Sequence, residues 1–490
     1  MGATTRNMAV AAVALALAAL TASAGLASGG SAKHRVRMYS THGTAPLATG
    51  LADPWLFNSN QRRTALGMTR AAGASYVRLA MSWNAVAPNL RPAGFVATDP
   101  TSPGYDWSNY DVIVKDAVEA GLTPILDIGD TPHWAHASRP KGGNAGTPNA
   151  SALGDFAKAL ATHYDGRTAG VPAVHVFEVW NEPNVSLYLD PVKASTYRTM
   201  VNDFAASVHA VDRSNVVLAG GLDPFGHRKS KKQRWYSSAP LAYMRSLLCL
   251  SKGSHPHSTC RSKIHFDVWT HHPYTFGGAF GHAKNADDVE LGDLPKMRQL
   301  LRAGVRLHHI VSSQQVRFWV TEFGWDSSPP RRHAAPMALA ARWTSESLYQ
   351  AWRSGVTLLT WFGLQDRGGR SPYQSGLFRA SKSLDRARVK PVRTAFRFPF
   401  VAYLGRGKVT VWGRDATSDR RTATIQVRHG SHGHWRTVAK VRANRYGILR
   451  TTLNLKATTR DWLRAVAPGS GKSLAFSLKV PHDPHIGPWG

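Results

Sequence analysis

The stretch Val174–Val185, VHVFEVWNEPNV, joins a run of apolar and aromatic residues to an abrupt polar ending. Its first seven residues have the composition of a buried strand, whereas Pro183 and Asn184 are typical of a turn. Glu182 therefore stands where a buried strand emerges from the protein interior. A carboxylate is costly to bury unless it is paired, so this position is a candidate functional site.

Similar apolar runs recur along the chain and alternate with helical patterns. The other strand-like runs are Tyr76–Ala80, Thr123–Gly129, Asn215–Gly221, His265–His272, Val316–Phe323 and Val356–Phe362, with a weaker one at Leu47–Leu51. Helical patterns include Asp111–Ala120, Ala152–His163, Lys193–Val211 and Met337–Arg353. Eight such units predict an α/β fold, a closed (β/α)8 TIM barrel. An open doubly wound sheet is the alternative, but no Gly-x-Gly-x-x-Gly follows the first strand.

The sequence pattern changes after Pro399. Short runs of alternating apolar and polar residues follow, separated by Gly, Asp, Asn and Ser. This pattern is typical of a small antiparallel β-sandwich. We therefore expect a catalytic barrel over residues 25–398 and a C-terminal β-sandwich domain over 399–490. A stabilising or wall-associating role is favoured for the second domain, with glycan binding left open.

The N-terminus has the pattern of a secretory signal peptide over residues 1–24. Arg6 precedes the apolar run Met8–Leu20, and Ala22-Ser23-Ala24 follows as a small-residue cleavage pattern. We expect a secreted, extracellular protein without a membrane segment in its mature form; an uncleaved membrane anchor is the alternative. Export favours a local disulfide between Cys249 and Cys260, although the spacing alone does not decide whether they are bridged.

The formal net charge of +31 favours acidic partners such as nucleic acid, an anionic cell-wall polymer or uronic-acid glycans. The alternative is an Arg-rich, solvated surface without a specific partner. The densest basic run, His227–Trp235, is short, and no nucleic-acid-binding signature accompanies it. We therefore expect no nucleic-acid partner and keep an anionic wall polymer as a candidate. Affinity for such a polymer should fall steeply with salt.

Glu182 has a counterpart in Glu322, at the end of the seventh predicted strand. Strand alternation predicts that Glu178 faces the same side as Glu182, and that Phe318 and Val320 face the same side as Glu322. Glu178 lies four residues earlier and is interpreted as a structural buried carboxylate. In a barrel both strand ends meet at one face, where two carboxyl groups can cleave a glycosidic bond by acid/base and nucleophilic catalysis.

Several neighbours fit this chemistry. Arg78, inside the second strand, needs a carboxylate partner, and pairing with Glu322 would lower the pKa of that carboxyl. A purely structural ion pair is the alternative. Tyr274 could donate to the same carboxylate, and Asn181 could bind a sugar 2-hydroxyl. His272 is either a site residue or a core histidine; a metal site is not expected, because no third ligand stands at a fitting spacing. Aromatic residues at or just past strand ends are expected to offer flat apolar faces to the sugar rings of a substrate: Trp83, Trp134, Trp180, Tyr274, Trp325 and Trp361.

At these positions the sequence resembles the clan A glycoside hydrolases, which are retaining (β/α)8 enzymes. The matching elements are Arg78, Asn181-Glu182-Pro183, His272-x-Tyr274, Glu322 and Trp361, in the order expected across Leu47–Ala395. The local texture, such as TPHWA and VWNEPN, looks most like family 39, with family 5 as the runner-up.

The resemblance implies a role for each matching residue. Glu182 would be the acid/base and Glu322 the nucleophile, supported by Arg78 and Tyr274. Asn181 would contact the 2-hydroxyl, His272 would line the site, and Trp361 would form its floor. Two loops depart from the family pattern: a Gly/Asn/Pro-rich loop after Trp134, and His227–Trp235. Both are expected on the substrate face.

We therefore expect a monomeric, secreted, retaining β-glycoside hydrolase that acts on an extracellular poly- or oligosaccharide without metal or organic cofactor. A catalytically silent glycan- or wall-binding barrel and a transglycosylase are the alternatives. The sugar, its linkage and endo or exo action depend on the loops, which periodicity does not describe.

Overall fold

The computed structural model describes residues 36–40, 45–140, 145–230, 234–369, 371–416, 421–430, 432–482 and 484–488. The predicted signal peptide, residues 1–24, lies outside the described residues, as does part of the basic run His227–Trp235. Within the described part of the chain, none of the helices combines the length and the apolar character needed to cross a bilayer.

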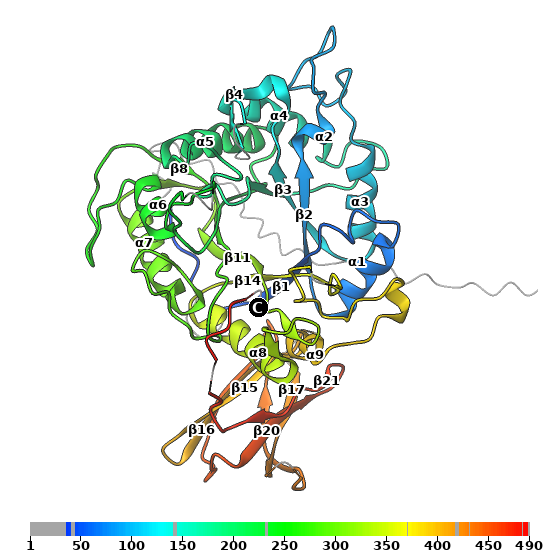
Figure 1. Ribbon diagram of the computed structural model, residues 1–490, viewed down its shortest axis with the longest axis vertical. Coiled ribbons are helices and arrows are strands. Elements are labelled where there is room, and N and C mark those ends of the chain that lie inside the picture. The colour runs from blue at the N-terminus through cyan, green and yellow to red at the C-terminus, as the bar shows by residue number, and fades with distance from the viewer. Residues whose placement is uncertain are drawn as a thin grey trace, which may run out of the picture. The chain divides into compact units, whose positions relative to one another are not determined.

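Eight parallel strands close into a barrel, which confirms the predicted (β/α)8 fold (Figure 1). Around the barrel their order is β1-β14-β11-β9-β7-β6-β3-β2. The strands are β1 (Ala48–Ala52), β2 (Tyr76–Ser82), β3 (Thr123–Gly129), β6 (Val176–Val179), β7 (Val216–Leu222), β9 (Val268–His271), β11 (Arg317–Phe323) and β14 (Leu358–Phe362). Closure pairs β1 with both β2 and β14, so the barrel has no free edge.

Helices cover the outside of the barrel. They are α1 (Arg62–Ala71), α2 (Trp83–Val86), α3 (Ser108–Glu119), α4 (Ala150–His163), α5 (Ala194–Val211), α6 (Pro240–Leu247), α7 (Leu294–Arg306), α8 (Met337–Arg353) and α9 (Pro391–Arg397). Their starts follow known capping chemistry: the Asn149 side chain accepts from the Ala152 N–H at the start of α4. Proline occupies the first turn of α6, α7 and α9, where no helical donor is lost.

The barrel interior is filled in layers. The lowest layer is an apolar cluster separate from the main core: Ile125, Val176, Leu218, Val268, Trp319 and Leu358, with Ala48, Tyr76 and Val216 packed against it. All eight strands contribute to this cluster, so it fills the inside of the barrel. It is not part of the layer between the strands and the surrounding helices. Above it the inward side chains become polar and include Arg78, Asp127, Glu178 and Thr321. Substrate chemistry can therefore take place only above this plug.

One predicted face assignment was wrong. Trp319 belongs to the lumen cluster, whereas Phe318 and Val320 belong to the core outside the barrel. Simple alternation would then turn Glu322 away from the lumen. The pairing of β11 with β14 shifts register between Val320 and Phe323, and this irregularity lets Glu322 reach the cavity.

The C-terminal antiparallel sheets begin at Phe400, close to the predicted boundary at residue 399. One sheet contains β15 (Phe400–Gly405), β16 (Lys408–Arg414) and β19 (Ile448–Leu453). The other contains β17 (Thr422–His429), β18 (Arg436–Arg442), β20 (Asp461–Ala467), β21 (Gly471–Lys472) and β22 (Phe476–Ser477). Residues from Val36 onward nevertheless form one compact unit. Aromatic contacts join the sheets to α8, including Tyr349 with Trp412 at 5.4 Å.

Smaller features complete the chain. Two-stranded ribbons pair β4 (His136–Ser138) with β5 (Thr147–Pro148), β8 (Ile264–His265) with β10 (Ile310–Val311), and β12 (Ser327–Ser328) with β13 (Ala335–Pro336). Three short 3-10 helices span His133–Ala135, Leu291–Asp293 and Leu384–Arg386. Cys249 and Cys260 form a disulfide, as the expectation of export favoured.

Candidate active site

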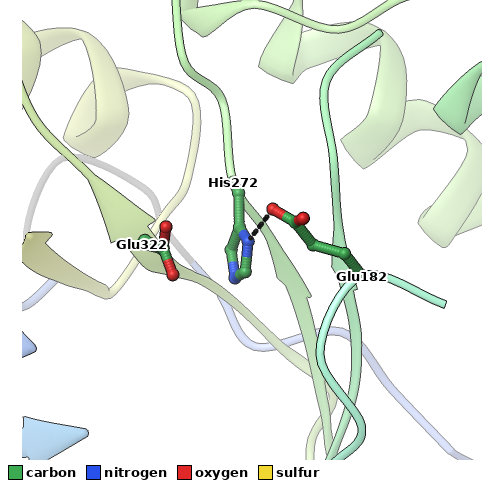
Figure 2. A group of neighbouring side chains, drawn as sticks. All are labelled: Glu182, His272 and Glu322. Carbon is green, nitrogen blue, oxygen red and sulfur yellow. Dashed lines mark hydrogen bonds and ion pairs between the residues drawn. The ribbon is translucent and has the colours of Figure 1, made fainter. Parts of the chain in front are cut away.

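A cavity of about 1070 Å³ opens at the carboxyl ends of the barrel strands. Its described lining includes residues at or beyond the ends of β2, β3, β6, β9, β11 and β14, together with loop residues. The carboxyl end is where (β/α)8 enzymes carry their chemistry. Glu182 and Glu322 both line this cavity, and Figure 2 shows them on either side of His272.

Glu182 is positioned by a sharp, strained turn after β6. Trp180 has φ 72° and Glu182 has φ 43°, values that residues other than glycine rarely adopt. Three hydrogen bonds hold the turn: Glu182 N–H donates to the Gly221 carbonyl, Val185 N–H to the Glu182 carbonyl, and the Trp180 indole to the Tyr188 carbonyl. Such strain persists only where the surroundings enforce it, and it is typical of functional sites.

The two predicted catalytic carboxylates lie close together. One ligand oxygen of Glu182, one of Glu322 and a ring nitrogen of His272 all lie within 4.8 Å of one another. The Tyr274 hydroxyl donates to Glu322 Oε1 at 2.8 Å, and Arg78 Nη1 lies 3.3 Å from Glu322 Oε2. The structure thus brings together Glu182, Glu322, Arg78 and Tyr274 as the sequence predicted.

Arg78 holds more carboxylates than the sequence indicated. Its shortest ion pair is with Glu178, at 2.6 Å between Nε and Oε2, and its Nη2 lies 3.0 Å from Asp127 Oδ2. The same Nη2 donates to Asn181 Oδ1 at 3.0 Å. Arg78 is therefore a structural partner of Glu178 that also contacts Glu322, so its ion pairing is not confined to a structural partner, and its support of a nucleophile stays a prediction.

The pKa values of the two glutamates of the cavity differ from the simple expectation. Burial raises the pKa of Glu322, and the positive charge of Arg78 and the hydrogen bond from Tyr274 do not fully offset it. Arg78 lowers the pKa of Glu322 as expected, but burial has the larger effect, so the net shift is upward. Burial also raises the pKa of Glu182, to about 7, against a smaller opposing effect of Arg78. Glu182 is thus suited to carry a proton near neutrality.

Glu178 is the ionised member of the group. Burial is the largest single influence and opposes its ionisation, but the positive charge of Arg78 and the hydrogen bonds from Arg78 and Thr321 together outweigh it and lower the pKa of Glu178. Its carboxylate accepts from Arg78 Nε and, on the other oxygen, from the Thr321 hydroxyl at 2.8 Å. Glu178 is fully buried and accepts a hydrogen bond on each carboxylate oxygen. It is therefore the structural carboxylate that its depth in the strand predicted.

His272 is buried and links Thr321 to Glu182. Burial lowers its pKa to about 4, so the ring is neutral near pH 7. Its Nε2 lies 3.2 Å from the Thr321 hydroxyl oxygen, and its Nδ1 lies 2.9 Å from Glu182 Oε1. Thr321 has one hydrogen, which goes to Glu178, so its oxygen accepts from the His272 Nε2–H. Nδ1 is then an acceptor, and the Glu182 carboxyl supplies the proton between them.

The same three residues, Glu182, His272 and Glu322, form a potential metal-ligand set. The sequence argument against a metal assumed that all ligands stand close together along the chain. That premise was wrong, because the fold brings together three ligands that are far apart in the sequence. The set nevertheless fits a cation poorly. The Arg78 guanidinium already contacts Glu322, and both remaining groups are engaged with each other. A cation here would face a fixed positive charge.

The predicted sugar-binding aromatics are only partly correct. Trp180 and Tyr274 line the cavity, but Trp134 and Trp361 are not part of its described lining. Trp134 packs edge-on against Trp83 at 5.8 Å, and the fully buried Trp361 donates its indole N–H to the Ser375 carbonyl. Direct contact of these two rings with substrate stays a prediction that this geometry does not support.

Other aromatic and acidic residues of the lining escaped the sequence analysis. They are Trp55, Tyr110, Asp127, Asp130, Tyr188, Asp223, Phe362 and Tyr373. Phe362 follows Trp361 directly, so the strand was identified but the wrong face was chosen. Both loops expected on the substrate face contribute: His136, Pro140, Ala145 and Gly146 come from the first and Trp235 from the second.

The family model of the cellulases, glycosyl hydrolase family 5, matches residues 31–346. The chain belongs to glycosyl hydrolase family 5. It is a glycoside hydrolase, and the runner-up of the two resemblances is the one whose family model matches. No curated protein matches the sequence of this family 5 member.

Several solved glycoside hydrolase structures are similar to this chain, and one family 39 enzyme shares the fold. A family 39 enzyme from Bacteroides cellulosilyticus WH2 has 16% identity and a TM-score of 0.51, over 86% of this chain and 81% of that one. A monomeric beta-xylosidase from Caulobacter crescentus CB15 has 16% identity and a TM-score of 0.47, over 86% and 96% of the two chains. A family 39 enzyme from Xanthomonas axonopodis pv. citri has 15% identity and a TM-score of 0.48, over 88% and 94%. At 16% identity, the similarity to the Bacteroides cellulosilyticus enzyme shows that the fold is shared and nothing about activity.

Proposed function

We propose that this family 5 member is an exported, retaining β-glycoside hydrolase of an extracellular poly- or oligosaccharide, with Glu182 as acid/base and Glu322 as nucleophile. The observation that supports this most strongly is the proximity of the two carboxylates, whose oxygens lie within 4.8 Å of each other. Retaining enzymes keep their carboxyl groups about 5–5.5 Å apart, whereas inverting enzymes need about 6.5–9.5 Å to admit a water.

The two-step mechanism follows from the hydrogen bonds. In the first step Glu322 attacks the anomeric carbon, the glycosidic C–O bond breaks, and Glu182 donates its proton to the leaving oxygen. In the second step water attacks the glycosyl-enzyme ester, Glu182 takes a proton from that water, and Glu322 is released. Tyr274 and Arg78 hold the Glu322 carboxylate in one orientation, so that little reorganisation is needed for attack.

The lining favours an uncharged sugar ring at the reacting position. Five carboxylate side chains and one guanidinium line the described cavity: Asp127, Asp130, Glu182, Asp223 and Glu322, with Arg78. Asp127 Oδ1 is buried and has no hydrogen-bond partner among the described residues, so it could accept from a substrate hydroxyl. An anionic glycone would find one guanidinium in this described lining, Arg78, which is already paired with Glu178, Asp127 and Glu322. The basic character of the whole chain therefore does not extend to the cavity.

The proposal of export rests on residues 1–24 and on the disulfide between Cys249 and Cys260, a bond typical of oxidising compartments. N-terminal sequencing of protein recovered from the culture medium tests it. Recovery only from the cell interior, with Met1 retained, would contradict export. We also propose a monomer, which sedimentation equilibrium of the mature protein tests directly.

The deciding experiment measures hydrolysis of a panel of aryl β-glycosides by the wild type and by Glu322→Ala, with and without azide. Activity should be lost in the variant and return with azide as an inverted glycosyl azide, because azide enters where the carboxylate stood. Natural oligosaccharides with an added alcohol acceptor then separate hydrolysis from transglycosylation. Folded wild type that is inactive on all aryl and natural glycans would favour the silent binding protein.

A further inference from the structure

One sheet of the C-terminal domain has a face unlike the rest of that domain. In β17 and β20 the buried residues alternate along the strand, and they include Ile425, Val427, Leu463 and Ala465. The residues between them point to the opposite side. Register pairs Arg428 with Trp462 and Gln426 with Arg464, so these four side chains share that outer face.

Guanidinium groups lie over both indole rings of this face. The Arg428 guanidinium carbon lies 4.7 Å from the centroid of Trp435 and 5.6 Å from that of Trp462. The Arg464 guanidinium carbon lies 4.1 Å from Trp435, and its Nε donates to Gln426 Oε1 at 2.8 Å. Arg428, Trp435, Trp462 and Arg464 are called the Arg–Trp face below. Cation–π contacts and packing hold both guanidiniums in place before any ligand arrives.

The positive charge of the Arg–Trp face is not matched by acid groups. The three strands β17, β18 and β20 contain a single carboxylate, Asp461, which is buried and bonded to His429 at 2.9 Å. Burial and the neighbouring charge of Arg428 lower the pKa of Arg464. Arg428 Nε is buried and has no hydrogen-bond partner in the described part of the chain. Two arginines held together, neither with an ion pair to a described residue, are suited to bind an anion.

We propose that the Arg–Trp face binds an anionic polysaccharide, with its carboxylate groups on Arg428 and Arg464, at a site separate from the catalytic cavity. Two forked guanidiniums match planar carboxylates in geometry, and their fixed position reduces the entropic cost of binding. The apolar edges of Trp435 and Trp462 offer contacts for the C–H groups of the sugar rings. Single-stranded nucleic acid is disfavoured, because guanidiniums already lie over the rings on which bases would stack.

This site adds to the proposed function and does not depend on it. The described cavity lining has one guanidinium, Arg78, which is already paired, whereas the Arg–Trp face has two arginines, so a polymer could be held on the face through its acidic residues while an uncharged segment enters the cavity. Holding one part of a chain raises the effective concentration of the rest at the active site.

The test measures binding of polygalacturonate, neutral dextran and poly(dT) to the full mature chain. The Arg428→Ala/Arg464→Ala variant is compared with Arg302→Ala/Arg306→Ala, which removes two exposed arginines from α7. We expect polygalacturonate to bind the wild type and the α7 variant alike, and the face variant about tenfold or more weakly. Binding should fall between about 0.1 M and about 1 M NaCl, where the screening length falls from about 10 Å to about 3 Å.

A loss of folding is separated from a loss of binding by two further measurements. Thermal unfolding should show similar midpoints for both double variants. The variant Arg428→Lys/Arg464→Lys keeps both positive charges but loses the forked guanidinium geometry. Its affinity for polygalacturonate should lie between those of the wild type and the alanine variant. Equal weakening in the face and α7 variants would overturn the proposal in favour of diffuse charge. Dextran binding as tight as polygalacturonate, or tighter binding of poly(dT), would overturn it as well.

Discussion

His272 Nδ1 lies 2.9 Å from Oε1 of Glu182, while the other nitrogen of the same ring faces the Thr321 hydroxyl. A continuous path of hydrogen bonds therefore runs from the buried Arg78–Glu178 ion pair through Thr321 and His272 to Glu182. Because Glu178 is ionised, each donor in this path points toward it. The proton on Glu182 is thus favoured by a charge that lies deep inside the barrel.

The protonation of Glu182 should control activity near neutral pH. Its pKa, raised to about 7 by burial, means that the acid form needed for the first step is lost as the pH rises through that value. For substrates with poor leaving groups, kcat/KM should fall with an apparent pKa of about 7. This fall is the alkaline limb of the pH–rate profile. Glu182→Gln should remove the limb and lower kcat by about 10²–10⁴-fold. A limb that persists in Glu182→Gln would assign the titration to another group.

Thr321→Val should shift that limb to lower pH. When Glu182 is ionised in the wild type, it accepts a hydrogen bond only if the His272 hydrogen lies on Nδ1. Nε2 of His272 then becomes an acceptor, so the Thr321 hydroxyl must donate to it and give up its hydrogen bond to Glu178. Without the hydroxyl that cost disappears. The apparent pKa of Glu182 should then fall by up to about one unit, since a hydrogen bond contributes about 0.5–1.5 kcal/mol. Thr321→Ser keeps the hydroxyl and serves as the control. An unmoved or raised limb in the valine variant would contradict the path.

Arg78→Met should be strongly destabilising. The side chain is 6% exposed and its removal leaves Glu178, 0% exposed, and Asp127, 6% exposed, without their counter-charge. The free energy of unfolding should fall by about 3–5 kcal/mol, as when one partner of a buried pair is removed. Arg167→Met is the matched control, because that arginine is 91% exposed and its ion pair with Asp165 is long, at 3.7 Å. Denaturant titration of both variants measures the difference; equal small losses would show that Arg78 is not structural.

Two tryptophans should separate substrate binding from stability. Trp55 lines the cavity and meets Phe362 and Tyr373 at 5.7 Å each. Trp55→Ala should raise KM about tenfold with little change in kcat, because it removes one aromatic contact with the sugar. Trp134→Ala should instead lower stability by about 3–5 kcal/mol, because the ring packs against Trp83 and Phe95. A raised KM in a stable Trp134→Ala variant would restore the role that its position in the sequence suggested.

The pattern of the sequence was sufficient where a local rule governs the structure. The predicted strand Thr123–Gly129 and the predicted helix Met337–Arg353 have the same bounds in the structure. Glu182 and Glu322 were identified because each ends a continuous apolar run, and parallel strands in a barrel bring such ends to one face. Period-two and period-3.6 patterns act over a few residues, so one sequence is enough to read them.

Face assignments failed where the strand is irregular. Alternation put Phe318 and Val320 on the side of Glu322, but the register shift after Val320 reverses the relation. Trp361 and Phe362 were exchanged for a similar reason, since a continuously apolar strand carries no signal for which residue faces the lumen. The pairing with neighbouring strands decides such faces, and it is not encoded within the strand itself.

The sequence by itself determined the barrel, the position of the two glutamates and the change to antiparallel strands after Pro399. Only the tertiary structure decided what surrounds them: the sharing of Arg78 among Glu178, Asp127 and Glu322, and the raised pKa of Glu182. The loop residues of the cavity and the Arg–Trp face also belong to this second group. Each depends on groups from different strands or loops meeting in space. Burial and charge arise from those meetings, whereas periodicity records only the local chain.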